Sequence, residues 1–380
     1  MLVCGEPSGD QLGAQLMAAL KSLAGDTVKI VGVGGEAMAA QGLKSLFPLD
    51  ATAVMGLHEI VPKIPQILAR VREAADFAVQ TNVDAVVLID SPDFTHRIAQ
   101  RLKRIAPRIV TINYVAPQVW ASRAYRARAM ARYFDLVLAL LPFEPQFFEG
   151  YGLPAVFVGH PAIERSARMT GGDAFRARHG IAPETPLLAV LPGSRTNEIR
   201  FIFPEIRKAV GLIAKRVPGL VTVLPTVPHV AARVRAATAN WPVPLHIVEG
   251  EDEKFAAFDA ADAALAASGT VTTELALSRT PMVVAYKVGW LTAALMEPLI
   301  HVKYITLVNL LLDREAVPEF LQARCKSQAL ADAVVTLLTD KNAAARQAAD
   351  LEDAMHRLGQ GAEQPSLRAA RAILEFLKRR

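Results

Sequence analysis

The chain opens with Met1-Leu2-Val3-Cys4-Gly5-Glu6-Pro7-Ser8-Gly9-Asp10, and this stretch decides the fold class. Its four apolar residues predict a short buried strand, and the turn with two glycines leads into a helical pattern over 11–23. A strand that turns tightly into a helix is the first half of a parallel βαβ unit. Such a turn brings backbone amides close to a ligand, and the amino end of a helix favours anions. A plain turn in which Ser8 or Asp10 caps the helix explains the same residues equally well.

The alternation of strand and helix patterns continues along the chain. It has a break at 159–173, a polar stretch that separates two series of βαβ units. Strands are predicted at 28–33, 85–89, 109–112, 136–139 and 155–158, and then at 187–191, 221–224, 245–248, 263–267 and 282–285. Helices are predicted at 11–23, 64–79, 96–105, 124–133 and 145–150.

Several of these strands are unbroken Val, Ile and Leu runs, as expected where helices cover both faces of a sheet. We therefore predict an α/β protein with two doubly wound parallel sheets. The predicted domains are 1–165 and 166–340. A helical tail at 341–380 is expected to pack on the first domain or on a partner subunit.

Composition excludes several classes of protein. A 380-residue chain with 52% hydrophobic and 21% charged residues is long enough for two cores and is not disordered. No run of about 18 uncharged apolar residues occurs, so no membrane span is predicted. Two cysteines cannot build a disulfide framework and, without a signal peptide, indicate a reducing cytosol. The eight histidines lack metal-ligand spacing, so we expect no metal site. No cofactor is expected either.

The net charge of +5 is unevenly distributed. Between Thr95 and Phe134 there are nine Lys and Arg residues and no acid, a segment we call the basic block. It favours an anionic partner such as phosphate, anionic lipid or nucleic acid, although the solvated face of one or two helices is the simpler interpretation of a charge run alone. The aromatic content of 6% and the lack of a recognised motif argue against nucleic acid.

Carboxylates follow the strand predicted at 85–89, in the segment Asp90-Ser91-Pro92-Asp93. Ligands of doubly wound sheets bind beyond the carboxyl ends of the strands. Asp93 is therefore a candidate general base for a hydroxyl group, whereas Asp90 is explained more simply as the end of its strand.

Two strand ends in the second half suit a nucleoside diphosphate. Gly193-Ser194-Arg195 offers backbone amides and a bidentate cation for a diphosphate. Ser268-Gly269-Thr270 opens a helix whose Glu274 could hold ribose hydroxyls. A capping box would require an acid three residues after Thr270, where Thr273 stands, so we expect the Glu274 carboxylate to be free for a ligand.

The segment Met55–Leu68 is apolar and interrupted by prolines. It could form an exposed patch that receives acyl chains or rests on a membrane. The competing interpretation is a helix packed on the sheet, which is the simpler one from the residues alone.

The motifs together resemble the lipid-A-disaccharide synthase family. The resemblance covers nearly the whole chain through eight motifs in order: Gly5–Asp10, Ile89–Phe94, Ala116–Ala121, Leu141–Glu144, Phe157–Pro161, Leu191–Arg195, Ala267–Thr270 and Asn309–Leu311. It implies a GT-B fold, in which two Rossmann-like domains face a cleft, and a reaction that needs no metal. Family members transfer 2,3-diacylglucosamine from UDP-2,3-diacylglucosamine to 2,3-diacylglucosamine 1-phosphate, with inversion, to give a β(1→6) disaccharide and UDP. They act as peripheral proteins on the cytoplasmic face of the inner membrane.

The resemblance and the residues together give three candidate sets. The catalytic set is Asp93, Asp90 and Ser8; the donor set is Gly193, Ser194, Arg195, Ser268, Gly269, Thr270, Glu274 and Asn309; the acceptor and membrane set is Glu6, Met55, Leu57, Ile60, Val61, Ile64, Arg123 and Arg126. Two other functions stay open, namely a UDP-sugar 2-epimerase of the same fold and a non-catalytic lipid- or nucleotide-binding protein. A homodimer on an anionic membrane surface is also expected.

Overall fold

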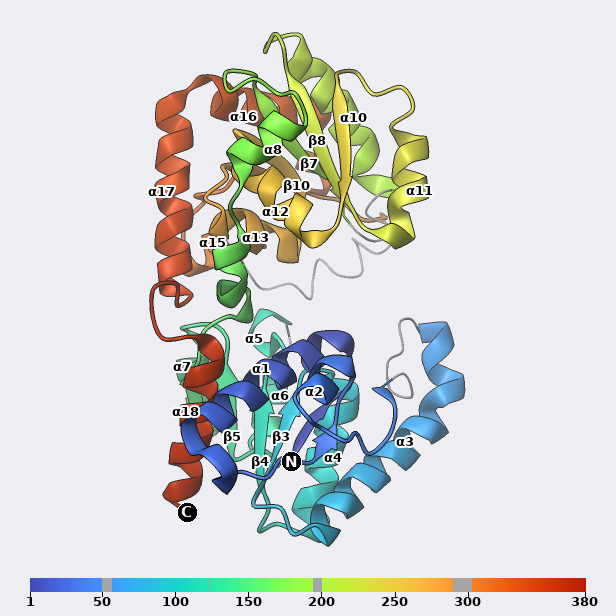
Figure 1. Ribbon diagram of the computed structural model, residues 1–380, viewed down its shortest axis with the longest axis vertical. Coiled ribbons are helices and arrows are strands. Elements are labelled where there is room, and N and C mark those ends of the chain that lie inside the picture. The colour runs from blue at the N-terminus through green and yellow to red at the C-terminus, as the bar shows by residue number, and fades with distance from the viewer. Residues whose placement is uncertain (50–56, 123, 194–199, 290–302) are drawn as a thin grey trace. The chain divides into compact units, whose positions relative to one another are not determined.

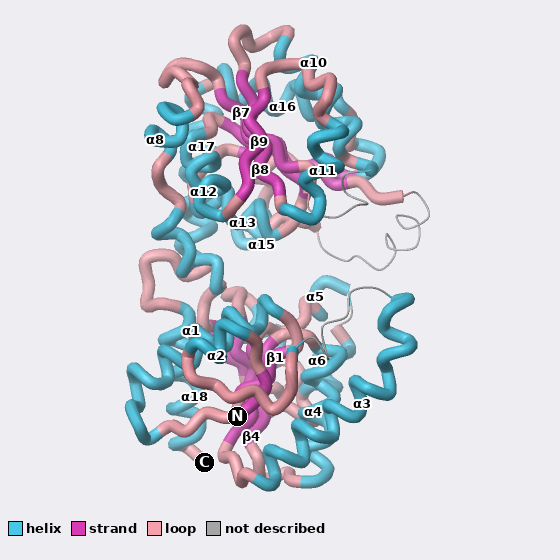
Figure 2. Tube along the Cα trace, turned by 45° about the vertical axis from the view of Figure 1, so that its right-hand side comes forward, coloured by secondary structure: helices cyan, strands magenta, loops and turns pink. Residues whose placement is uncertain are grey.

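The computed structural model describes residues 1–49, 57–122, 124–193, 200–289 and 303–380. They form two compact units: Met1–Pro161 with Gly361–Arg380 is the first unit, and Ala162–Gln360 is the second. In each unit a parallel sheet lies at the centre and helices cover it (Figure 1). Figure 2 shows the strands of each sheet enclosed by helices on both sides, as the unbroken apolar strands predict.

The first unit contains a six-stranded sheet in the order β2-β1-β3-β4-β5-β6. Its strands are β1 (Leu2–Cys4), β2 (Gly32–Val33), β3 (Ala85–Ile89), β4 (Val110–Tyr114), β5 (Leu136–Ala139) and β6 (Ala155–Phe157). Its helices include α1 (Pro7–Ala24), α2 (Glu36–Ala40), α3 (Leu57–Gln80), α4 (Pro92–Ile105), α5 (Val119–Ser122), α6 (Tyr125–Met130), α7 (Glu144–Glu149) and α18 (Pro365–Lys378). The direction in which strands are added reverses between β1 and β3, and such a reversal is where doubly wound sheets bind ligands.

The prediction of a strand at 28–33 is wrong for most of this range, because only Gly32 and Val33 are in a strand. Gly32 has a φ of +150°, and a Cβ there would lie 1.8 Å from the carbonyl oxygen of Leu2. Only glycine fits this close approach to β1. A single parallel bridge from Gly32 to Ser45 follows on the outer side, so this edge of the sheet is short.

Helix α3 begins at Leu57 and continues through two prolines to Gln80, well before the start predicted at residue 64. Its second half packs on the sheet through Val71, Ala74, Ala75 and Ala78, which are buried. Each proline removes one backbone hydrogen bond without ending the helix. The sequence therefore correctly located a helix here and misjudged the effect of the prolines.

The second unit has the strand order β12-β11-β10-β7-β8-β9. Its strands are β7 (Leu187–Leu191), β8 (Val221–Thr226), β9 (Leu245–Glu249), β10 (Ala263–Ala267), β11 (Met282–Tyr286) and β12 (Glu319–Leu321). Its helices include α8 (Gly172–Arg178), α10 (Phe203–Ala214), α11 (Pro228–Ala237), α12 (Glu251–Ala260), α13 (Thr270–Leu277), α15 (Leu307–Leu312), α16 (Ser327–Thr339) and α17 (Lys341–Arg357). Counted from β7, this is the order 3-2-1-4-5-6 of nucleotide-binding sheets, with its reversal between β7 and β10.

The helices of the tail belong to different units. Helix α17 contacts α13, α15 and α16 of the second unit. Helix α18 lies beside α1 in the first unit (Figure 1), where Ala369, Ala370 and Ile373 join its core. A hydrogen bond of 2.7 Å from Arg368 Nη2 to the carbonyl of Phe157 adds to this packing. Of the tail predicted at 341–380, only its last helix therefore packs on the first unit.

None of the helices in the described ranges has both the length and the apolar character needed to cross a membrane.

Candidate active site

Two turns meet at the carboxyl edge of the first sheet, one after β1 and one after β3. Ser8 Oγ, in the first turn of α1, donates a 3.1 Å hydrogen bond to Asp90 Oδ2. The other carboxylate oxygen of Asp90 accepts from the backbone amide of Ser91 at 2.8 Å. A Cβ on Gly5 would lie 2.7 Å from Ser91 Cβ, so a glycine is needed for the two turns to touch. The structure thus brings together Ser8 and Asp90, which the sequence places 82 residues apart.

The backbone at this edge is strained. Asp90 and Ser91 have φ values of 55° and 45°, and Val115, just after β4, has a φ of 70°. Left-handed backbone costs about 1–3 kcal/mol at a residue other than glycine, and a β-branched valine is the least suited to it. Surrounding hydrogen bonds hold the conformation: Asp90 N donates to the carbonyl of Tyr114, and Thr95 Oγ1 donates to the carbonyl of Asp90. Strain held in this way is typical of functional sites.

Asp93 lies in the first turn of α4 with its side chain exposed. The amino end of a helix stabilises a carboxylate. Asp93 also lies on the rim of a pocket of about 340 Å³, which we call the α4–α6 pocket. The pocket is lined by Pro92, Asp93, His96, Arg97, Gln100, Pro117, Val119, Arg126, Ala129, Met130 and Tyr133. A ligand in this pocket can therefore contact the candidate base.

The sequence analysis missed His96, Gln100 and Tyr133 of this pocket. His96 Nδ1 lies 3.2 Å from the hydroxyl of Tyr133, and burial lowers the pKa of His96 to about 4. The i, i+3 spacing from Asp93 would have placed His96 on the same face of the helix. Its contact with Tyr133 joins residues 37 positions apart, and no local pattern predicts it.

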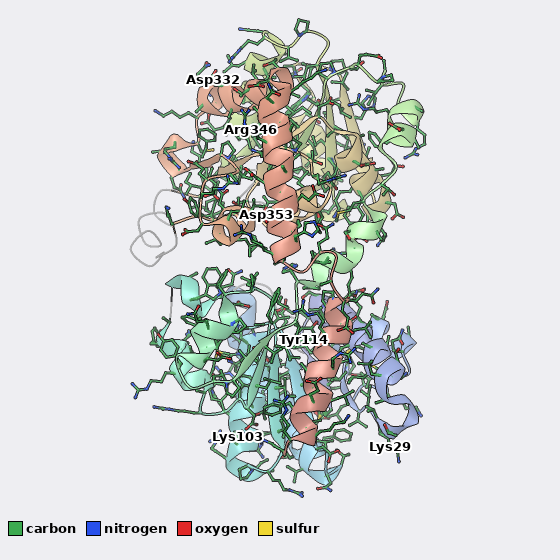
Figure 3. The ribbon with its side chains drawn as sticks, turned by 90° about the vertical axis from the view of Figure 1, so that its left-hand side faces the viewer. Lys29, Lys103, Tyr114, Asp332, Arg346 and Asp353 are labelled. Carbon is green, nitrogen blue, oxygen red and sulfur yellow. The ribbon has the colours of Figure 1, made fainter. Side chains whose placement is uncertain are left out.

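The basic block does not form one surface. Lys103 pairs with Asp135 at 2.7 Å, and Arg101 pairs with Asp76 at 2.8 Å. Figure 3 shows Lys103 towards one end of the first sheet and Tyr114, the last residue of β4, towards the other. Arg97 and Arg126 line the α4–α6 pocket instead. Arg123 and Met55 lie outside the described residues, as do the side chains of Leu57, Ile60 and Val61.

Two buried acids in the motifs of the first unit have structural partners. Glu144 accepts hydrogen bonds from Trp120 Nε1 and from the amides of Leu140 and Leu141, and its burial raises its pKa. Asp10 accepts from three backbone amides at the start of α2. Asp10 thus caps α2 rather than its own helix, while Glu6 is the N-cap residue of α1 by backbone position.

The second unit has a pocket of about 320 Å³ at the carboxyl ends of β7, β8 and β10, which we call the β7–β10 pocket. It contains five residues of the predicted donor set: Gly193, Ser268, Gly269, Thr270 and Glu274. Apart from its chain neighbours, no atom of the described residues lies within 4 Å of the point where a Cβ on Gly269 would stand, so a ligand can approach the backbone there. Ser194 and Arg195 lie outside the described residues. The pocket occupies the reversal between β7 and β10, where a nucleotide is expected.

The expectation that the Glu274 carboxylate is free is wrong. Glu274 lines the β7–β10 pocket, but its Oε2 accepts from Lys254 Nζ at 2.9 Å and its Oε1 lies 3.5 Å from Arg165 Nη1. Lys254, which the sequence analysis missed, comes from α12 and also lines the pocket. Thr226 adds a buried hydroxyl without a partner among the described residues. The pocket thus contains a cation and a hydroxyl that suit an anionic, oxygen-rich ligand.

The prediction that the Asn309 side chain binds the UDP-sugar donor is wrong. It is fully buried, and its Nδ2 donates to the carbonyl of Val317 and to Glu319 Oε1. Its Oδ1 accepts from the amides of Ala316 and Val317. An amide side chain can make four hydrogen bonds, and all four are used within the protein. Asn309 therefore holds the loop between α15 and β12.

The described residues were also compared with the requirements of a metal site. Among the residues that the structure describes, no three His, Cys, Asp or Glu side chains are grouped as a metal ion would require.

Known proteins resemble this chain over nearly its whole length. A family model for lipid-A-disaccharide synthetase matches residues 1–374. Lipid-A-disaccharide synthases from Rhodospirillum centenum and Paramagnetospirillum magneticum are 48% and 47% identical over 379 residues, covering 100% and 99% of this chain and 94% and 97% of their own.

A solved structure has the same arrangement of sheets at low sequence identity. The UDP-GlcNAc 2-epimerase from Neisseria meningitidis bound to UDP-GlcNAc matches with a TM-score of 0.63 at 14% identity, covering 100% of this chain and 99% of that one. The predicted GT-B type of fold, with two doubly wound parallel sheets, is confirmed. From the family model and its relatives, this chain belongs to the lipid-A-disaccharide synthase family.

Proposed function

We propose that this chain is a glycosyltransferase that moves 2,3-diacylglucosamine from its UDP derivative to 2,3-diacylglucosamine 1-phosphate. The observation that carries the proposal is a candidate site at the carboxyl edge of each sheet. One offers an exposed carboxylate, Asp93, and the other offers the open backbone of Gly269 with the cation Lys254. Membership of the lipid-A-disaccharide synthase family supplies the identity of the substrates.

Asp93 acts as the general base in the proposed reaction. It takes the proton from the 6-hydroxyl of the acceptor as that oxygen attacks C1 of the donor. The new C1–O6 bond forms as the bond from C1 to the diphosphate oxygen breaks, and UDP leaves with the electron pair. Attack from the face opposite the leaving group inverts C1 and gives the β(1→6) linkage.

The second unit binds the leaving group. Negative charge develops on the diphosphate as the bond breaks, and amides and cations fixed around it stabilise that charge. In this proposal Ser268, Gly269 and Thr270 supply the amides and hydroxyls, and Lys254 is the cation. In the first unit, Ser8 and Asp90 hold the turn that presents Asp93.

The assay uses pure protein, UDP-2,3-diacylglucosamine and the diacylated 1-phosphate, with mass spectrometry of the lipid products. We expect a disaccharide 1-phosphate that appears only when both substrates are present. The fold is also that of UDP-sugar 2-epimerases, one of which is bound to UDP-GlcNAc. Conversion of the UDP-sugar without acceptor would identify an epimerase. No turnover at all would indicate a non-catalytic binding protein.

We also propose that the enzyme works at the inner, cytoplasmic surface of a membrane. Ile64 and Leu68 of α3 are 43% and 36% exposed, although Ile67 between them packs on the core. Each apolar side chain that becomes fully buried contributes about 1.5–3 kcal/mol, so a few are enough for reversible binding.

The double variant Ile64→Asp/Leu68→Asp tests the membrane proposal. It should keep a native circular dichroism spectrum and lose binding to phosphatidylglycerol vesicles, because its changes lie on the exposed face. The control Ile67→Asp should unfold α3 from the core. Unchanged vesicle binding by the folded double variant would refute the proposal. A homodimer also remains a proposal, and light scattering that gives the mass of one chain would refute it.

A further inference from the structure

We propose that the α4–α6 pocket of the first unit binds the phosphate monoester of the acceptor sugar. The inference rests on the proposed function, since the acceptor is the substrate that carries both a phosphate and the attacking hydroxyl. The pocket is about 340 Å³, within the size range of sugar-sized ligand sites. A site for phosphate alone would not need this volume.

Two arginines give the pocket its positive charge. Arg97 and Arg126 line it, and within the described part of the chain neither forms an ion pair with a carboxylate. Their neighbours Arg101 and Lys103 are paired with Asp76 and Asp135, so their charges are neutralised. Guanidinium groups bind phosphate oxygens in a bidentate manner.

One of the arginines is also oriented. Arg97 Nε donates a 2.9 Å hydrogen bond to the backbone carbonyl of Asp93, one helical turn earlier. This bond uses the inner nitrogen and leaves the two terminal nitrogens for a ligand. Arg126 lines the same pocket from α6, whereas Arg97 lines it from α4.

The pocket also contains the uncharged side chains of His96, Gln100 and Tyr133. The hydroxyl of Tyr133 lies 3.2 Å from His96 Nδ1. The His96 ring packs edge-on against Phe134 with 5.0 Å between the ring centres. Burial lowers the pKa of His96 to about 4, so the ring is neutral at pH 7. The two arginines are therefore the cations of this pocket among the described residues.

Asp93 determines how the ligand lies. A phosphate beside this carboxylate would be repelled, so in this proposal the phosphate binds the two guanidinium groups and lies away from the Asp93 carboxylate. The sugar ring then spans from the arginines to Asp93 and presents a hydroxyl at the base. One pocket thus explains both the recognition of the phosphate and the placing of the nucleophile.

The test compares the phosphorylated acceptor with 2,3-diacylglucosamine lacking the phosphate, both in neutral detergent micelles. The wild-type enzyme should prefer the phosphorylated acceptor. Arg126→Ala and Arg97→Ala should each lower kcat/KM for the phosphorylated acceptor about tenfold and change it less than twofold for the other. The KM of the UDP donor should not change. Arg126→Lys, which keeps the charge without the fork, should recover part of the loss.

Arg128→Ala is the matched control, because Arg128 lies on the same helix, is exposed and does not line the pocket. It should leave the ratio between the two acceptors unchanged. An equal loss for both acceptors in Arg126→Ala would overturn the proposal, as would a wild-type enzyme with no preference.

Two further measurements test whether the pocket is specific for a sugar phosphate. Arg126→Ala should lose no more binding to phosphatidylglycerol vesicles than Arg128→Ala, and a larger loss would identify a lipid headgroup site instead. If the wild-type protein makes no disaccharide from either acceptor, the proposed function fails. Calorimetry with glucosamine 1-phosphate, glucosamine and inorganic phosphate then still tests the pocket. The proposal is supported if the wild-type protein binds glucosamine 1-phosphate but neither glucosamine nor inorganic phosphate, and if Arg126→Ala loses this binding. Any other result overturns the proposal.

Discussion

Each sheet has a reversal of strand order, and the turns at the two reversals are built differently. At the reversal between β1 and β3, the turn after β3 is left-handed at Asp90 and Ser91 and is tied to the other turn through Ser8. At the reversal between β7 and β10, Gly193 supplies the left-handed residue without strain, and Gly269 leaves the backbone open. The turns of the first sheet hold side chains in fixed positions, whereas the turns of the second sheet leave the backbone open to a ligand.

This difference matches the chemistry that we propose for each site. A general base acts on one proton in one direction, so its position must be held within a small tolerance. A diphosphate has many oxygens and is bound well by several amides and a cation together. Strained backbone is therefore expected around the base, and glycine is expected around the phosphates.

The largest expected effect is at the base. Asp93→Asn keeps the shape of the side chain and removes its ability to accept a proton, so kcat should fall about 10²- to 10⁴-fold. The affinity for UDP should stay the same, because the donor residues lie in the second unit. Single-turnover rates and calorimetry with UDP measure the two quantities. An Asp93→Asn enzyme with near-normal turnover would show that the base is elsewhere.

The second prediction compares two aspartates that cap helices. Asp10 is 6% exposed and accepts from the amides of Gly35, Ala37 and Met38, whereas Asp340 in the second unit is an exposed cap of α17. Asp10→Ala leaves three amides without an acceptor and should destabilise the first unit by about 3 kcal/mol. Asp340→Ala should cost only about 1 kcal/mol. Urea unfolding followed by circular dichroism measures both, and equal losses would contradict the assigned role of Asp10.

The fold could be predicted from the sequence because its strands are unbroken apolar runs between helical patterns. The strand ends were predicted for the same reason, so Asp90, Asp93, Gly193 and Ser268–Thr270 were correctly placed just beyond the carboxyl ends of strands. Strand 28–33 failed because its first residues are partly exposed and only Gly32 fits against β1.

The sequence analysis missed residues whose place in a pocket is set by contacts between distant parts of the chain. Lys254 reaches the β7–β10 pocket from α12, and Tyr133 reaches His96 from beyond α6. The periodicity of a single helix or strand cannot predict such contacts. Asn309 shows the opposite error, since a motif residue can be needed for the fold and not for the ligand.

The smallest expected effect concerns Lys254 and Glu274 in the second unit. Lys254→Met removes the cation and leaves Glu274, which is 5% exposed, with the longer contact to Arg165 as its remaining ion pair among the described residues. Its carboxylate then repels a diphosphate, and the Kd of UDP should rise about tenfold. The Kd of pyrophosphate should rise by the same factor, because the lost interaction is with the phosphates.

Glu274→Gln separates the two functions of the carboxylate. If Glu274 holds ribose hydroxyls, this variant should weaken UDP binding severalfold and leave pyrophosphate binding no weaker than in the wild type, because it removes a negative charge beside Lys254. The control is Lys215→Met, a change at an exposed lysine just after α10 that should alter neither Kd. If Glu274→Gln binds UDP more tightly than the wild type, the carboxylate serves only to hold Lys254. The ribose would then be bound elsewhere in the β7–β10 pocket, with the unpartnered hydroxyl of Thr226 as the next candidate among the described residues.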